Sequence, residues 1–295
     1  MLQELLQHLD AGYARNIRSY GAREVCMTVW AWGKLRHIPS DGAWRATCSV
    51  LCQVQAPIAA QAAAEATTAE VNAAQAASPA AARAGQGPAE WLSGAGGTRR
   101  SGLLHTATPQ GLAMLCWGLS QVGCSDDGVW AAVEAAVLRS LPQLQPRDLS
   151  NIAWAFATSN RHSMLVFTAL AQAAAPRIVD LTAQDMANLA WAYAASGHPY
   201  RPLFDAIAPA AAQLLHAFTP QGLANLAWAF AQARVPAPAL FQGIVREAAG
   251  RLPRFQAGQL AMLAWAVARS GEWHAPLLSS ISSMVQADMQ VRGWR

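Results

Sequence analysis

The sequence is poor in charged residues, and poorest in lysine. Only 13% of its 295 residues are charged, whereas 53% are hydrophobic, and this balance excludes a wholly disordered chain. Lys34 is the only lysine, so arginine supplies the rest of the basic charge. The formal net charge of +4 is a weak indication of nucleic-acid binding. Either the arginines contact phosphate, or they follow, with the abundant alanine, glycine and proline, from the codons of a GC-rich genome.

Long apolar runs, paired cysteines and catalytic motifs are also missing. No apolar run reaches the roughly 18 residues of a membrane span, so we expect no membrane insertion. The five cysteines form no CxxC pair, and we interpret them as reduced, mostly buried thiols. The sequence has no P-loop, GxGxxG, HExxH or GxSxG motif, and its seven histidines are scattered. We therefore expect no enzyme, and no catalytic residue, metal site, cofactor or small-molecule substrate.

A repeat occupies most of the chain. From Thr108 onwards the sequence divides into five blocks of 37 residues without insertion or deletion, and each block carries one anchor tryptophan. The anchor tryptophans of these five blocks are Trp117, Trp154, Trp191, Trp228 and Trp265. A sixth unit fits the same frame around Trp30, and residues 1–20 fit the second half of a still earlier unit. We expect the chain to begin inside a repeat, either as a fragment or because a leader and further repeats are missing.

The repeat pattern divides the chain into three parts. Residues 1–57 hold half a repeat and one full repeat, and residues 108–295 hold the five tandem repeats. Residues 58–107 are rich in alanine and glycine, and they form either a flexible insertion or a degenerate repeat, since PAEWL at residues 88–92 looks like the start of a second helix.

Each repeat predicts two helices, A and B. Helix A follows Thr or Gln, often with Pro next, as at Thr108 and Thr219, and we expect it over residues 220–232 and their equivalents. Gly or Asn six residues after the tryptophan suits a left-handed C-terminal residue, with Arg234 as the exception. Prolines then open helix B. The predicted fold is all-α, an α-solenoid of stacked 37-residue helical hairpins.

The motif PQGLANLAWAFA, which recurs every 37 residues, resembles the octotricopeptide repeats of green algae and the related heptatricopeptide repeats. PAEWL also looks like the Pro-Pro-Pro-Glu-Trp element of that family. The resemblance covers residues 1–57 and 108–292. It implies an organellar protein, of mitochondrion or chloroplast, that binds single-stranded RNA. Members of the family act in mRNA stabilisation, splicing or translation, and some are built into mitochondrial ribosomes.

Helix A is expected to bury one side and to expose the other. We place the anchor tryptophan with the Leu two before it and the aromatic residue two after it, and expect all six anchor tryptophans in the core. The opposite side would carry the positions seven, six and three before the tryptophan and one and four after it. That side is rich in Asn and Gln, whose amides can recognise base edges, and in alanine, which lets a nucleotide approach the backbone.

Three rows of that side and one arginine cluster are the candidate RNA site. The position three before the tryptophan is Asn in three successive repeats, so it serves either RNA or bonds between helices, whereas the position four after it varies as a base-recognising position should. Arg246, Arg251 and Arg254 make the fourth repeat the most basic unit, suited to phosphate. The predicted RNA-binding residues are Lys34, Gln121, Arg147, Asn151, Thr158, Gln184, Asn188, Gln221, Asn225, Gln232, Arg246, Arg251, Arg254 and Arg269.

These patterns favour an organellar α-solenoid that holds single-stranded mRNA or rRNA along helix A. The protein would act either as a free factor or as a subunit of a mitochondrial ribosome or another ribonucleoprotein. The alternative is a protein–protein scaffold with no RNA contact, which the modest net charge favours.

Overall fold

All regular structure in the described residues is helical. The computed structural model describes residues 2–52, 102–271 and 274–291, and these contain thirteen α-helices, six short 3-10 helices and no strand. The all-α prediction is confirmed. Residues 53–101, which include most of the predicted flexible insertion, lie outside the described part of the chain. The last residues of the insertion, 102–107, are described, and they contain a short 3-10 helix (η2, Leu103–His105) with Leu104 buried.

Two kinds of helix alternate along the chain. Helices A are α2 (Ala22–Leu35), α5 (Pro109–Gln121), α7 (Pro146–Thr158), α9 (Ala183–Ala195), α11 (Pro220–Ala233) and α13 (Ala257–Ser270). Helices B are α1 (Leu2–Asn16), α3 (Asp41–Cys52), α6 (Asp127–Ser140), α8 (Met164–Ala174), α10 (Arg201–Gln213), α12 (Pro238–Ala249) and α14 (Ala275–Val291). From α5 to α13, each helix A begins 37 residues after the one before, at 109, 146, 183, 220 and 257.

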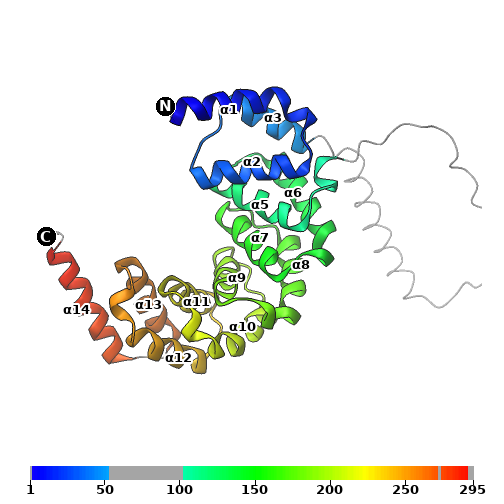
Figure 1. Ribbon diagram of the computed structural model, residues 1–295. Helices are drawn as coiled ribbons and strands as arrows, with labels where there is room; N and C mark the ends of the chain where they lie inside the picture. The colour runs from blue at the N-terminus through cyan, green and yellow to red at the C-terminus, as the bar shows by residue number, and fades with distance from the viewer. Residues whose placement is uncertain (1, 53–101, 272–273, 292–295) are drawn as a thin grey trace, which may run out of the picture.

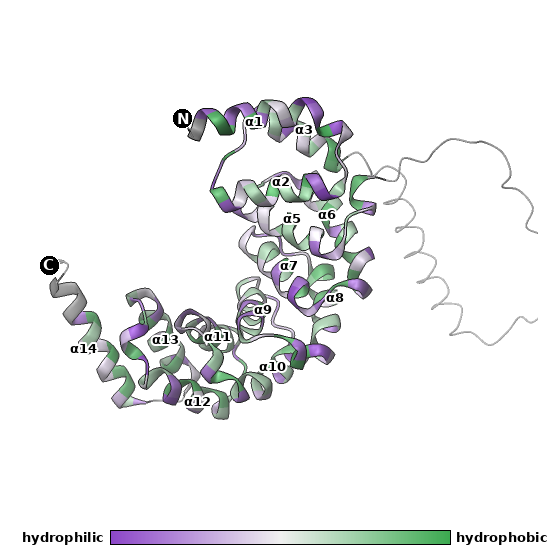
Figure 2. Cartoon of the chain, in the orientation of Figure 1, coloured by the Kyte–Doolittle hydropathy of each residue, from purple (hydrophilic) through white to green (hydrophobic). Residues whose placement is uncertain are grey.

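The helices form a two-layered arc (Figure 1). Each helix A packs against the next, in the order α2, α5, α7, α9, α11 and α13, and these helices line the inner side of the arc. The helices B from α3 to α12 lie on the outer side, and each contacts its own helix A or the neighbouring helices B. Hydrophobic residues recur in both layers, with hydrophilic ones concentrated at the turns and exposed edges (Figure 2).

Short 3-10 helices connect each helix B to the next helix A. They are η1 (Ile17–Ser19), η2, η3 (Leu141–Gln143), η4 (Ala175–Asp180), η5 (Leu215–Ala217) and η6 (Leu252–Arg254). An aliphatic side chain thirteen residues before each anchor tryptophan falls in these turns and is buried in most of them. These aliphatic residues are Ile17, Leu104, Leu141, Ile178, Leu215 and Leu252, of which Leu141 is half-buried. Ile17 and Leu104 also occupy this position, so the units around Trp30 and Trp117 have the same register as the later units.

The predicted helix ends are present. The Thr108 and Thr219 hydroxyls accept hydrogen bonds from the third backbone N–H of α5 and α11, as N-caps do. The residues expected in the left-handed region adopt it, with φ of 70° at Gly123 and 56° at Asn160. Arg234, the exception in the sequence, has the same conformation with φ of 55°. The turn geometry therefore belongs to the repeat and overrides the usual preference for glycine.

Neighbouring units are also joined by polar contacts at both edges of the arc. Seven residues after the anchor tryptophan, a side chain reaches into the preceding unit. Arg161 pairs with Asp127, and Nε2 of His198 lies 3.3 Å from the carbonyl oxygen of His162. In the first unit the equivalent residue is His37, and its Nε2 lies 3.0 Å from Oδ2 of Asp10.

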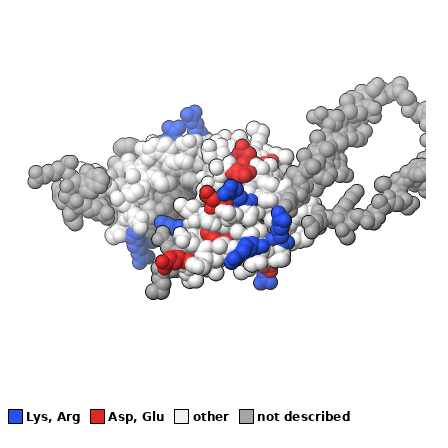
Figure 3. All heavy atoms as spheres, turned by 90° about the horizontal axis from the view of Figure 1, so that it is seen from above, with Lys and Arg blue, Asp and Glu red and all other residues white. Residues whose placement is uncertain are grey.

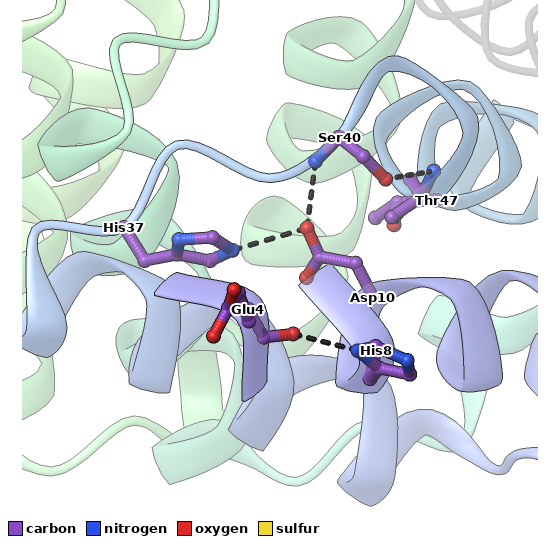
Figure 4. A network of polar contacts seen from close by, with 7 residues as sticks. Glu4, His8, Asp10, His37, Ser40 and Thr47 are labelled. Atoms are coloured by element: carbon purple, nitrogen blue, oxygen red, sulfur yellow. Dashed lines mark hydrogen bonds and ion pairs between the residues drawn. The ribbon is translucent and has the colours of Figure 1, made fainter. Parts of the chain in front are cut away.

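Asp10 is the centre of this first contact (Figure 4). Its carboxylate is only 2% exposed and also accepts a hydrogen bond of 2.7 Å from the backbone N–H of Ser40. The contact joins α1 to the loop between α2 and α3, so His37 contributes to packing between units in the same way as His198 after α9.

Small residues let the helices A approach one another. At Gly118, one residue after the anchor tryptophan of α5, an added Cβ would lie 2.6 Å from the carbonyl oxygen of Val29 in α2. At Gly33 in α2, an added Cβ would lie 3.0 Å from Cβ of Gln121. Residues 53–101 separate α2 from α5 in the sequence, yet the two helices are direct neighbours in the inner layer.

This contact yields a stability prediction. Gly118→Ala should lower the free energy of unfolding by about 1–3 kcal/mol, because backbone and not a flexible side chain must move to admit the methyl group. Gly258→Ala in α13 is the matched control, since nothing lies within 4 Å of its added Cβ, and it should be neutral or stabilising by up to about 1 kcal/mol. Urea unfolding followed by circular dichroism measures both. Equal values for the two variants would contradict the close packing of α2 on α5.

Candidate nucleic-acid interface

The anchor tryptophans lie on the polar side of helix A. At about 100° per residue, the positions seven and three before the tryptophan and four after it fall within roughly 60° of it. The Leu two before and the aromatic residue two after fall about 160° away. In α11 these are Leu226 and Phe230, and both are fully buried. Our assignment of the tryptophan to the core side was therefore wrong, because it joined residues from opposite sides of one helix.

The exposure of the tryptophans agrees with this geometry. Trp30, Trp117, Trp154, Trp191 and Trp228 are half-buried, and Trp265 is 40% exposed. The expectation that all six are buried is wrong. Helix A meets helix B on one side and neighbouring helices A on its two flanks, so only its remaining side, on the inner surface of the arc, is free to expose them. We call these six residues the inner tryptophan row.

Ring contacts run along part of this row. The ring centroids of Trp191 and Trp228 are 6.2 Å apart, and those of Trp228 and Trp265 are 6.5 Å apart, with interplanar angles of 32° in both pairs. At the other end, the Lys34 ammonium lies 4.7 Å from the Trp117 ring centroid and 5.6 Å from that of Trp30. The Arg269 guanidinium lies 5.3 Å from the Trp265 centroid. Cations thus cover ring faces at both ends of the row.

Amide side chains border the row toward the start of each helix A. Nε2 of Gln184 donates to Oδ1 of Asn188 over 2.8 Å, and Gln221 donates in the same way to Asn225 over 2.7 Å. Gln259 of the next unit donates to Oε1 of Gln221 over 2.9 Å. These asparagines thus accept bonds within their own helix and not from a neighbouring one. The amides stay at the surface, where they can also bond a ligand.

The remaining predicted residues of helix A surround the row. Arg147 is exposed and Asn151 half-buried on α7, seven and three residues before Trp154. Gln121 and Gln232 are exposed four residues after their tryptophans, like Lys34 and Arg269. Thr158 holds the same position, but its hydroxyl donates to the carbonyl of Trp154 in its own helix. The structure therefore brings the varied row and the amide row together on one surface, with the tryptophans between them.

Two positions assigned to the ligand side belong to the packing. The alanines one residue after the tryptophans, such as Ala192 and Ala229, are fully buried, so no nucleotide approaches the backbone there. Asp148 and Asp185, six residues before, cap their helices by accepting from the backbone N–H of Gln145 and of Thr182. Burial raises the pKa of Asp148, while the hydrogen bond from Gln145 and nearby Arg147 lower it.

The arginine cluster of the fourth unit does not join this surface. Arg251 donates to the backbone carbonyls of Phe218 and Leu215 over 3.0 and 3.2 Å, and it pairs with Glu247. Its phosphate-binding assignment is wrong, since its hydrogen-bonding groups join two units. Arg177, in the same position of an earlier unit, donates to the carbonyl of Leu144 over 2.8 Å. The exposed Arg246 lies on α12 in the outer layer, and the exposed Arg254 lies in η6, which connects α12 to α13.

The described residues give little support for reactive thiols, a metal site or a membrane-spanning helix. Burial raises the pKa of Cys26 and Cys48 to about 12 and that of Cys124 to about 11, so these thiols stay protonated near neutral pH. Within the ranges 2–52, 102–271 and 274–291, no group of three His, Cys, Asp or Glu residues could hold a metal ion. Among the described helices, none combines the length and the apolar character needed to cross a bilayer.

Charge is sparse and mixed on the visible surface. In the view onto the N-terminal end of the arc, basic and acidic atoms lie near one another and most of the surface is uncharged (Figure 3). No protein-family model matches the chain, and no curated protein does so either. The arrangement of side chains on the inner surface is therefore the basis for a functional assignment.

The position of the tryptophan row can be tested through stability. Phe230→Ala should lower the free energy of unfolding by about 3–5 kcal/mol, because this ring is fully buried and its loss leaves a cavity. Trp228→Ala should cost only about 1–2 kcal/mol, because its side chain is only partly buried. Chemical denaturation of both variants measures these free energies of unfolding. If Trp228→Ala destabilises the fold as much as Phe230→Ala does, the anchor tryptophans are part of the core.

A second pair of variants tests the two kinds of arginine. Arg251→Ala should destabilise the fold by about 1–3 kcal/mol, since two carbonyls lose their donor. Arg254→Ala, three residues away and exposed, should change stability by no more than about 0.5 kcal/mol. Thermal unfolding gives the comparison. If both variants are as stable as the original chain, Arg251 has no structural role.

Proposed function

We propose that this protein is an α-solenoid of 37-residue helical hairpins, of the octotricopeptide or heptatricopeptide kind, that binds single-stranded RNA along its inner surface. The observation that carries the proposal is the inner tryptophan row with amide and basic side chains on both sides. Proteins that hold single strands combine aromatic rings, on which bases stack, with cations that follow the backbone. Amides beside the rings add hydrogen bonds to base edges.

The geometry of the row suits a strand and not a duplex. The rings recur once per helix A along the inside of the arc, and neighbouring rings in the second half of the row are 6.2 and 6.5 Å apart. Paired bases would hide their faces from these rings, whereas unpaired bases can turn toward them. At about one nucleotide per repeat, the six helices A imply a footprint of roughly six nucleotides.

The resemblance and the chemistry support a binding role and not catalysis. An mRNA or an rRNA is the expected ligand, and the resemblance favours a location in a mitochondrion or chloroplast. The protein would act as a factor on its own or as part of a ribosome or another ribonucleoprotein. No cofactor is required for such binding.

A protein-binding function is the second candidate, and one observation favours it. Apolar side chains are exposed on α1, on α2 and in the loop after α2, where Leu9, Met27, Leu35 and Ile38 are 59%, 48%, 60% and 82% exposed. Such a group suits contact with another protein. A subunit of a ribonucleoprotein would use this surface and the inner row at once.

A binding titration against randomised single-stranded RNA at two salt concentrations tests the proposal. Arg147→Gln removes an exposed cation beside the row, and it should weaken binding to all sequences and reduce the slope of log K against log salt by about one. Gln232→Ala should instead weaken binding to some sequences more than to others, because an amide recognises bases. Arg246→Gln on the outer layer is the control and should change neither quantity.

Two results would contradict the proposal. One is that the unsubstituted protein binds a protein partner but no single-stranded RNA. The other is an equal effect of Arg147→Gln and Arg246→Gln, which would mean that RNA does not choose the inner surface.

A further inference from the structure

The inner surface contains one hollow in which ring faces, cations and amides meet. A cavity of about 610 Å³ lies between α2, α5 and α7 and is lined by Trp30, Lys34, Met114, Trp117, Arg147 and Asn151, among others. Its volume is in the range of sites that hold small organic groups. Three consecutive helices A contribute to it, so it belongs to the same surface as the inner tryptophan row.

The tryptophans at this cavity differ from those farther along the row. Trp191, Trp228 and Trp265 pack on one another, with centroids 6.2 and 6.5 Å apart. Trp30 and Trp117 are instead both approached by the ammonium of Lys34. A lysine is flexible and strongly hydrated, so it can leave a ring face at little cost. The ring faces at the cavity can thus be freed for a ligand, whereas in the second half of the row Trp228 packs against an indole on each side.

The charges at the cavity favour an anionic ligand. Lys34 and Arg147 are both exposed and basic. The acid in the lining is Asp148, which is 7% exposed and accepts a hydrogen bond from the backbone N–H of Gln145. A cationic guest would meet two like charges, although indole faces alone attract cations. A planar group that carries a phosphate satisfies both the rings and the charges.

Amide side chains also line the cavity. Gln110 and Asn151 are both in the lining, and each amide offers a donor and an acceptor that can pair with the edge of a base. Met114 adds a polarizable side chain that packs well against aromatic rings.

We propose that this cavity is a binding site for one nucleotide of a single-stranded RNA, with its base stacked on Trp117. In that complex the base takes the place of the Lys34 ammonium over the ring, and the ammonium turns to the phosphate. This inference rests on the proposed function, and it adds that the strand is fixed at the α2–α5–α7 end, whereas at α9, α11 and α13 it passes over tryptophans that pack on one another and inserts no base between them.

The test uses the full chain and a fluorescein-labelled RNA of eight randomised nucleotides. Trp117→Ala should weaken binding about 5- to 100-fold, the loss expected when one base loses its stacking partner. Trp191→Ala is the matched comparison, with the same position in the repeat and a ring packed against Trp228, and it should weaken binding by a clearly smaller factor than Trp117→Ala. Trp117→Phe keeps a ring and should restore most of the affinity. Circular dichroism establishes that each variant is folded.

Cross-linking gives a measurement that does not depend on a variant. RNA that carries 4-thiouridine, irradiated with the original chain, should attach to the tryptic peptide that contains Trp117 more than to those that contain Trp191, Trp228 or Trp265. If RNA binds but Trp117→Ala and Trp191→Ala behave alike and the cross-links fall on α9, α11 and α13, the cavity proposal fails while RNA binding stands. If the original chain binds no single-stranded RNA, both proposals fail.

Discussion

Close contact between consecutive helices A is the interaction on which the rest of the structure depends. Each helix A from α5 to α13 places a glycine or alanine one residue after its tryptophan, and these residues, Gly118, Ala155, Ala192, Ala229 and Ala266, are buried. Where the contact is closest, between α2 and α5, even a methyl group would meet backbone atoms at 2.6 Å. Small residues at this position therefore allow the inner layer to form, and the inner layer fixes which side of helix A stays at the surface.

The exposed tryptophans follow from this packing. One side of helix A packs against the core and its two flanks pack against neighbouring helices A. A large side chain at the anchor position can therefore lie only on the inner surface. A ring that recurs every 37 residues then forms a row because the units stack in register, and the cations and amides at neighbouring helical positions join it. Arg161, Arg177 and Arg251 each contact the preceding unit, through an ion pair or hydrogen bonds, and these contacts stabilise that register.

Much of the fold could be predicted from the sequence, because the local signals are strong and repeated. The 37-residue period, the Thr-Pro starts and the left-handed ends gave helix bounds that the structure bears out to within a residue or two at α11. The candidate site was predicted in part. The positions four after and three and seven before the tryptophan do lie together, but the tryptophan was assigned to the wrong side, although the rotation of an α-helix alone places it beside them.

Other parts of the site could not be obtained from the sequence. The arginines of the fourth unit form a basic cluster in the sequence, and only the fold shows that the Arg251 guanidinium is used by the carbonyls of Phe218 and Leu215 in the preceding unit. In the same way, the contact of Lys34 with the Trp117 indole depends on the packing of α2 against α5 across residues 53–101, a distance along the chain that no periodic pattern spans.

Oxidative footprinting of tryptophan determines whether RNA covers the inner tryptophan row. Hydroxyl radicals should oxidise the anchor tryptophans in the free chain, and single-stranded RNA should protect them. Trp130, which is 3% exposed, should stay unmodified with and without RNA and so serves as an internal control. RNA binding by the inner tryptophan row would be contradicted if the anchor tryptophans resist oxidation in the free chain as Trp130 does, or if saturating RNA leaves their oxidation unchanged.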